Sequence, residues 1–183
     1  MIREEDLVEI THTANITLVL VAVERIMERL QEQEDMYRVA AQVIEAGKSW
    51  IQTRNPTPEQ LYWEYSPTLM EIDSLPEVHS IYEEKPYIQY AFHALIYAHL
   101  ITVWLSEAVE RTEKPTTIYS IGNDIAEVSD SYLTECLHYC IEASLVPEQM
   151  EAWLHRVVAR LNQYHDSRQK GYIGELVAAE LFL

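Results

Sequence analysis

Glycine is scarce in this chain: the 183 residues include only Gly47, Gly122, Gly171 and Gly174. Tight turns and phosphate-binding loops depend on glycine, because a residue without a Cβ adopts their backbone conformations most freely. The small number therefore argues against an all-β fold with many short turns and against a Gly-rich nucleotide-binding loop.

Cysteine is also rare, with only Cys136 and Cys140, four residues apart in a helical pattern. A single pair at this spacing is neither a zinc-finger signature nor the framework of a disulfide-rich secreted domain. We therefore expect two reduced cysteines that are buried in a cytoplasmic protein.

Basic residues are few: thirteen Lys and Arg stand against thirty Asp and Glu, which gives a formal net charge of −17. Nucleic acids and anionic membranes bind proteins through Lys and Arg, so an acidic surface repels both. Such a surface suits a basic protein partner, and it also keeps a protein soluble without any partner. The composition leaves these two interpretations open.

Charged residues are missing altogether from residues 86–105, a segment long enough to cross a bilayer. The segment contains a glutamine, two histidines and three tyrosines, which make it too polar for a lipid-facing helix. We therefore expect it to form the buried central helix of a soluble bundle. The N-terminal residues 1–6 are acidic overall, which does not match the basic start of a secretory signal.

Helical periodicity is the feature that the chain has in abundance. Apolar residues recur at three- and four-residue spacing from Leu18 to Leu30 and again from Met36 to Ile51. Thr57-Pro58-Glu59-Gln60 is a helix start, because Thr57 caps, proline suits the first turn and Gln60 completes a capping box. No stretch shows sustained period-two alternation, so no strand is expected.

The predicted elements are therefore all helices. Their expected ranges are about 14–33, 36–55, 57–65, 86–111, 124–143 and 147–167, followed by a last helix in the apolar tail 172–183. Residues 66–84 form the longest predicted loop, since Pro67 and Pro76 interrupt them, with one short helix at about 68–72. We expect an all-α fold: a single domain, 1–183, of six or seven helices around a buried central helix at about 86–111.

Two Glu-x-x-His pairs are candidates for a metal site: Glu9 with His12, and Glu135 with His138. Residues three apart share one face of a helix, and two such pairs with two further Glu residues hold the di-iron centre of ferritin-like bundles. The pattern here is incomplete, because the first pair lies at the start of the sequence with no helix before it. Our main interpretation is a protein that has neither catalytic residues nor a cofactor. The alternative is a metal-dependent enzyme of the di-iron carboxylate type, with Glu9, His12, Glu135 and His138 as ligands.

Arg160 and His165 form an Arg-x4-His pattern that is similar to the motif of the helical HEPN ribonucleases. In that family the arginine holds phosphate and the histidine assists attack by the ribose 2′-hydroxyl. An Arg and a His near a helix C-terminus also interact favourably with the helix dipole, without any catalysis. A HEPN-like ribonuclease is therefore a second enzyme alternative, although the acidic chain disfavours RNA.

A further set of carboxylates, Glu24 and Glu28 with Glu127 and Asp130, resembles the paired motifs that hold Mg²⁺ in helical nucleotide pyrophosphohydrolases. In that family the two pairs lie close in sequence, whereas about a hundred residues separate them here. A solvated helical surface accounts for these residues better.

The first half of the chain resembles a helical family of immunity proteins from bacterial polymorphic-toxin systems. The matching stretches are residues 22–30, 39–50, the capped helix 57–61 and 91–99. In the family, an Ala- and His-rich central helix follows a helix that ends in Trp and a short capped helix. The family's Asp-Pro-Arg-type turn is replaced here by Glu34-Asp35-Met36-Tyr37-Arg38, and the region after Thr112 has no counterpart. The resemblance implies a cytoplasmic inhibitor that binds a toxin and catalyses nothing.

We therefore expect a cytoplasmic acidic protein that neutralises a basic toxin by direct protein–protein binding, with no cofactor, nucleic acid or membrane. Its expected contact surface is residues 66–84 with the start of the next helix, where acids and tyrosines alternate and a loop would carry recognition. The candidate residues are Glu71, Asp73, Glu77, Tyr82, Glu83, Glu84 and Tyr87. An ordinary solvated connection is the other interpretation of this segment. The partner's identity and the oligomeric state stay open.

Overall fold

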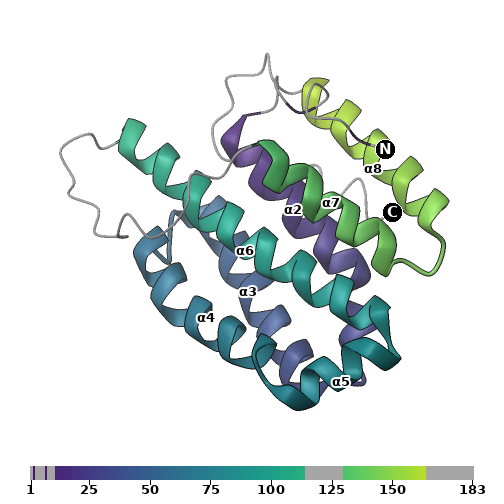
Figure 1. Ribbon diagram of the computed structural model, residues 1–183. Coiled ribbons are helices and arrows are strands. Elements are labelled where there is room, and N and C mark those ends of the chain that lie inside the picture. The colour runs from purple at the N-terminus through teal and green to yellow at the C-terminus, as the bar shows by residue number, and fades with distance from the viewer. Residues whose placement is uncertain (1, 3–6, 8–10, 114–129, 164–183) are drawn as a thin grey trace.

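The computed structural model describes Ile2, Leu7 and residues 11–113 and 130–163. In these residues the chain forms seven α-helices and one short 3-10 helix, and no strand (Figure 1). The elements are α2 (His12–Ile26), η1 (Met27–Leu30), α3 (Glu34–Thr53), α4 (Pro58–Asp73), α5 (Pro76–Glu84), α6 (Pro86–Glu113), α7 (Asp130–Ala143) and α8 (Pro147–Gln163). The all-α fold expected from the sequence is confirmed.

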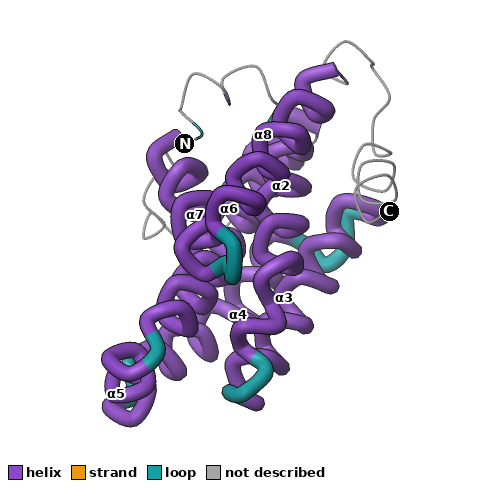
Figure 2. Tube along the Cα trace, turned by 90° about the vertical axis from the view of Figure 1, so that its right-hand side faces the viewer, coloured by secondary structure: helices purple, strands orange, loops and turns teal. Residues whose placement is uncertain are grey.

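The central helix of the bundle is α6, which contacts α2, α3, α4, α5 and α7. Figure 1 shows α6 running between α7 and α4, and Figures 1 and 2 place α5 at one end of the bundle. The prediction of a buried central helix at about 86–111 is confirmed. By length and composition, Pro86–Thr112 is also apolar enough to span a membrane, but 67% of the tested window is buried inside the molecule.

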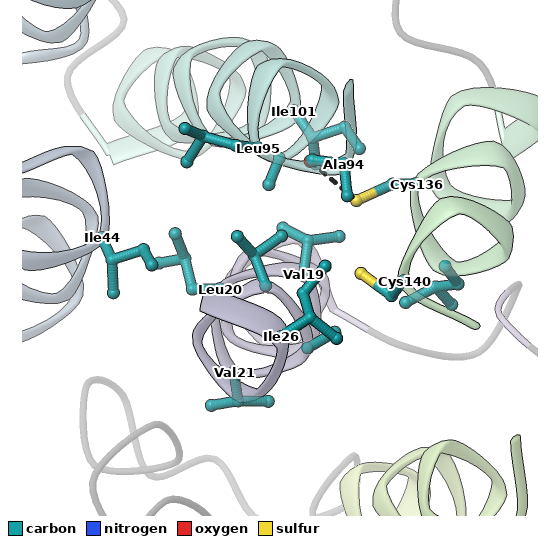
Figure 3. Packing of buried hydrophobic residues seen from close by; sticks show 14 of the residues in the cluster. Val19, Leu20, Val21, Ile26, Ile44, Ala94, Leu95, Ile101, Cys136 and Cys140 are labelled. Carbon is teal, nitrogen blue, oxygen red and sulfur yellow. Dashed lines mark hydrogen bonds between the residues drawn. The ribbon is translucent and has the colours of Figure 1, made fainter. Parts of the chain in front are cut away.

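A second helix, α2, is even more completely enclosed. All ten residues from Ala14 to Val23 are buried, so this helix has no polar face. Figure 3 shows its side chains pointing in several directions, with Ile44 of α3, Leu95 of α6 and Cys140 of α7 around it. Each fully buried Leu, Ile or Val contributes about 1.5–3 kcal/mol through removal of apolar surface from water.

The two cysteines lie on α7 where it packs against this core. Both are free and fully buried, as expected. The Cys136 thiol donates a hydrogen bond to the backbone oxygen of Ala94, at 3.4 Å (Figure 3). Burial raises the pKa of the Cys140 thiol well above its usual value, so this side chain behaves as a small apolar group.

The predicted long loop at residues 66–84 is wrong, because this segment is helical. Pro67 lies inside α4, which continues to Asp73, and Pro76 begins α5. Proline removes one backbone donor, but Pro67 is on the exposed side of α4, where water can bond the carbonyl that it leaves unpaired. The buried side chain of Leu69 holds the following turn in the core. Pro76 stands in the first turn of α5, where a backbone N–H has no helical partner.

Most other helix boundaries lie within a few residues of those predicted from the sequence. The capping box of α4 is present: Thr57 Oγ1 accepts from the Gln60 N–H at 3.3 Å, and Gln60 Oε1 accepts from the Thr57 N–H at 2.8 Å. The first predicted helix ends earlier, at Ile26, and continues as the 3-10 turn η1. The predicted tail helix 172–183 and the start of the helix predicted at 124–143 lie outside the described residues.

A polar pair joins α4 to α6 inside the bundle. His99 Nε2 lies 2.8 Å from Ser66 Oγ, and the His99 residue is only 2% exposed. The ring of Tyr65 meets the imidazole edge-on, with centroids 6.2 Å apart. Burial lowers the pKa of His99 to about 4, so the imidazole is neutral at physiological pH.

This buried histidine makes stability depend on pH in a defined window. The unfolded chain protonates His99 near its ordinary pKa of 6.5, whereas the folded protein protonates it only near 4. Between these values the unfolded state binds more protons, so His99 lowers the free energy of unfolding by up to about 3 kcal/mol as the pH falls. Above pH 6.5 it has no such effect.

We predict that His99→Gln, whose amide still reaches Ser66 without titrating, removes this dependence. Urea unfolding of both proteins at intervals from pH 7 to pH 4 measures it. The stability of the wild type relative to the variant should fall by about 3 kcal/mol across the window. A difference that stays constant with pH would show that His99 is not held neutral in the folded state.

Candidate functional site

The surface of α4 and α5 carries charge of one sign. No Lys or Arg occurs between Arg54 and Lys85, and the two helices contain seven acids. These are Glu59, Glu64, Glu71, Asp73, Glu77, Glu83 and Glu84. All are exposed except Asp73, which is half-buried. Lys85, directly after α5, forms an ion pair with Glu32.

Asp73, at the end of α4, is the centre of a small polar cluster. Its Oδ1 accepts a hydrogen bond from the Tyr82 hydroxyl at 2.9 Å and lies 3.3 Å from His93 Nε2. His79 Nε2 lies 2.9 Å from the backbone oxygen of Asp73. The Tyr82 ring stacks on His79, with centroids 6.2 Å apart, and meets His93 edge-on at 5.8 Å. One carboxylate thus joins side chains from α4, α5 and α6.

A cavity of about 360 Å³ opens beside this cluster. It is lined by Asp73, His79, Tyr82, Glu83, Gln89 and His93. Burial raises the pKa of Tyr82, and the hydrogen bond to Asp73 raises it further, so the phenol stays a donor. The volume is at the lower end of the range for pockets that bind small ligands. Two carboxylates, two imidazoles and one phenol give it a polar lining suited to a cationic group.

The structure divides the predicted partner-binding residues into three groups. Asp73, Tyr82 and Glu83 line the cavity. Glu71, Glu77 and Glu84 are exposed on the same two helices. Tyr87 is separate, because its ring is covered by the Arg29 guanidinium, whose central carbon lies 3.9 Å from the ring centroid.

Sequence reasoning missed three cavity residues: His79, Gln89 and His93. The spacing of Tyr90, His93 and Tyr97 places them on one face of the central helix, and this spacing is the signal by which His93 could have been found. The positions of His79 and Gln89 depend on α5 being a helix, and the pattern of the sequence had indicated a loop there.

The candidate metal ligands are not assembled within the described residues. Glu9 lies outside them, and His12, Glu135 and His138 are exposed. Glu135 forms a hydrogen bond with Tyr97; burial first and this bond second raise the pKa of the tyrosine. In the part of the chain that the structure describes, no group of three or more His, Cys, Asp or Glu side chains is placed to hold a metal ion.

The other two enzyme motifs are only partly described. Arg160 lies in the last turn of α8, and His165 is outside the described residues. Glu24 is paired with Lys48, at 2.5 Å from Oε1 to Nζ. Glu28 is exposed, while Glu127 and the Asp130 side chain are not described. Neither motif is therefore brought together by the described structure.

Comparison of the chain with protein-family models, with curated proteins and with solved structures gives no match in any of the three. The interpretation of this surface therefore depends on its own geometry and charge.

The cluster around Asp73 predicts a measurable contribution to stability. Tyr82→Phe removes the hydroxyl that donates to the carboxylate, and we expect it to lower the free energy of unfolding by about 1–2 kcal/mol. Urea unfolding near neutral pH measures this loss. The matched control is Tyr37→Phe, an exposed tyrosine on α3 that should change stability very little. Equal effects of the two substitutions would contradict the structural role of the Tyr82–Asp73 bond.

Proposed function

We propose that this protein is an acidic binding protein that holds a basic protein partner on the surface of α4 and α5. In this proposal it acts as a cytoplasmic immunity protein that neutralises a toxin by occluding a basic surface. The observation that supports the proposal most is the charge of these two consecutive helices, with seven acids and no Lys or Arg. The resemblance of the first half of the chain to immunity proteins agrees with this function.

Long-range attraction is the first contribution of such a surface. At physiological ionic strength, exposed charges act over roughly 8 Å, so closely spaced acids on two adjacent helices produce one negative field. A field of this kind accelerates association with a basic protein and disfavours acidic competitors.

Short-range contacts are the second contribution. Trp63 and Met70, seven residues apart on α4, are 60% and 47% exposed, so both are available to a partner. The contacts of Asp73 with Tyr82 and His93 fix the lining of the cavity before any partner arrives, which reduces the entropy lost on binding. The surface therefore combines steering charges with ordered and apolar anchors.

The partner is sought among the products of adjacent genes, by co-expression and co-purification. The proposal expects a basic protein whose toxicity is suppressed by this chain and that co-purifies with it. If adjacent genes encode no basic or toxic protein and nothing co-purifies, the immunity function is contradicted.

The contact surface is tested by the double substitution Glu71→Lys and Glu84→Lys. Both residues are exposed in the last turns of their helices, where a lysine suits the helix dipole, so folding should be kept. Asp73 is left intact because of its hydrogen bonds. We expect the association rate constant, measured by stopped flow, to fall by about tenfold or more and to depend less on salt.

The matched control reverses the same charge on α3, with Glu34→Lys and Glu45→Lys, both exposed. It changes the net charge equally but leaves α4 and α5 untouched. We expect a clearly smaller change in the association rate. If the two double variants slow association equally, only the net charge matters and α4 and α5 are not the interface.

A further inference from the structure

Beside the acidic helices, the rings of six aromatic side chains form a continuous line across α5, α6 and α7, which we term the aromatic track. In order along the line, these residues are His79, Tyr82, His93, Tyr139, Tyr97 and Tyr132. The centroids of successive rings lie between 5.4 and 6.2 Å apart. Tyr90 stacks on Tyr139 at 6.2 Å and widens the line at its middle. Figures 1 and 2 show α7 alongside α6 and α5 at one end of the bundle.

The track is open to solvent along much of its length. Tyr97, Tyr132 and Tyr139 are half-buried, and the His93 side chain is 25% exposed. These four rings are therefore partly accessible to a ligand, whereas the Tyr82 residue is only 7% exposed. A cavity of about 360 Å³, lined by Asp73, Tyr82, Glu83 and His93 among others, lies at the α5 end.

Among the described residues, the charged side chains placed at these rings are acidic. Asp73 and Glu83 lie at the cavity, and Glu135 contacts Tyr97 near the other end. No Lys or Arg occurs in α5, in residues 86–110 of α6, or in α7. The nearest described bases in sequence are engaged elsewhere: Lys85 with Glu32, and Arg111 with Glu107.

We propose that the aromatic track binds an extended, arginine-bearing segment of the basic partner, with one guanidinium in the cavity at Asp73. This inference rests on the proposed function, because it specifies how the basic partner is recognised. The arginine in the cavity pairs with the carboxylate of Asp73, and further arginines along the segment lie over the rings of Tyr139 and Tyr97.

Arginine fits this surface better than lysine for two physical reasons. Its planar guanidinium stacks on aromatic faces and forms forked hydrogen bonds with a carboxylate, whereas the lysine ammonium is a compact, strongly hydrated charge. In the described structure, Asp73 Oδ1 receives the contacts from Tyr82 and His93, and no described contact involves Oδ2. The carboxylate is thus oriented by one oxygen and offers the other to a donor.

The test uses the full chain and two peptides of equal length and charge, oligoarginine and oligolysine. Affinities are measured by isothermal titration calorimetry at low and physiological salt. We expect oligoarginine to bind about fivefold more tightly than oligolysine, and to keep more of its affinity at the higher salt concentration.

Two variants assign this preference to the track. Tyr139→Leu removes the central ring but keeps apolar packing, and Asp73→Asn keeps an acceptor for Tyr82 but removes the charge. Each should weaken oligoarginine about threefold to tenfold with a much smaller effect on oligolysine. The double variant Glu71→Lys and Glu84→Lys is the control, and it should weaken both peptides by similar factors. Thermal melting of each variant checks that it is folded.

A measurement on the unmodified chain keeps the test independent of any variant. On adding oligoarginine, the NMR signals of the Tyr97, Tyr132, Tyr139 and His93 rings should shift together. Shifts confined to other parts of the surface, or equal binding of the two peptides in every variant, would overturn the inference. Tight binding of free arginine would show that the cavity is a small-molecule site. Self-association of the chain that is lost in Tyr139→Leu would show that the track is a dimer interface. Either result also contradicts the inference.

Failure of this inference is distinguishable from failure of the proposed function. If a natural basic partner binds, and binding responds to Glu71→Lys and Glu84→Lys but not to Tyr139→Leu, the function stands and the track is wrong. If no natural partner exists but oligoarginine binds along the track as described, the recognition chemistry stands and the immunity function is wrong.

Discussion

The enclosure of α2 is the constraint on which the rest of this structure depends. A helix with ten consecutive buried residues cannot lie at a surface, so other helices must cover it on every side. The side of α6 that carries Leu95 supplies one of these covers. Another side of α6 carries Tyr90, His93 and Tyr97, which meet rings of α5 and α7 that close only partly over them. Tyr90, His93 and Tyr97 are half-buried there, and the candidate surface is built around them.

Two buried polar links between helices fix how α6 faces α3 and α4. Glu110, at the C-terminal end of α6, is 4% exposed and accepts a hydrogen bond from Trp50 Nε1 of α3 at 3.1 Å. His99 and Ser66 make the corresponding link from α6 to α4. Buried groups of this kind are costly when unpaired, so each link penalises a sliding of one helix along the other. These links hold α4 and α6, which carry Asp73 and His93, in a fixed position relative to each other.

The sequence predicted the helices well because their apolar residues recur with helical spacing and their starts carry recognisable caps. It failed at residues 66–84, where two prolines indicated a loop; whether proline breaks a helix depends on which side of the helix it faces, and that is set by tertiary packing. The acids of the surface were predicted, since charge is visible in composition. The neighbours of Asp73 were not, because His93 and Tyr82 reach it only through the packing of α5 and α6 in space.

Amide hydrogen exchange of the full chain tests most directly the claim that a rigid α2–α6 core carries a less stable acidic surface. Because α2 is buried throughout, its amides from Ile16 to Val23 should exchange only by global unfolding, with the same free energy as those of Ala91 to Val103 in α6. In α5, only Val78 and Tyr82 are buried, so its amides should exchange faster, by local opening. Exchange in α2 as fast as in α5 would contradict the account.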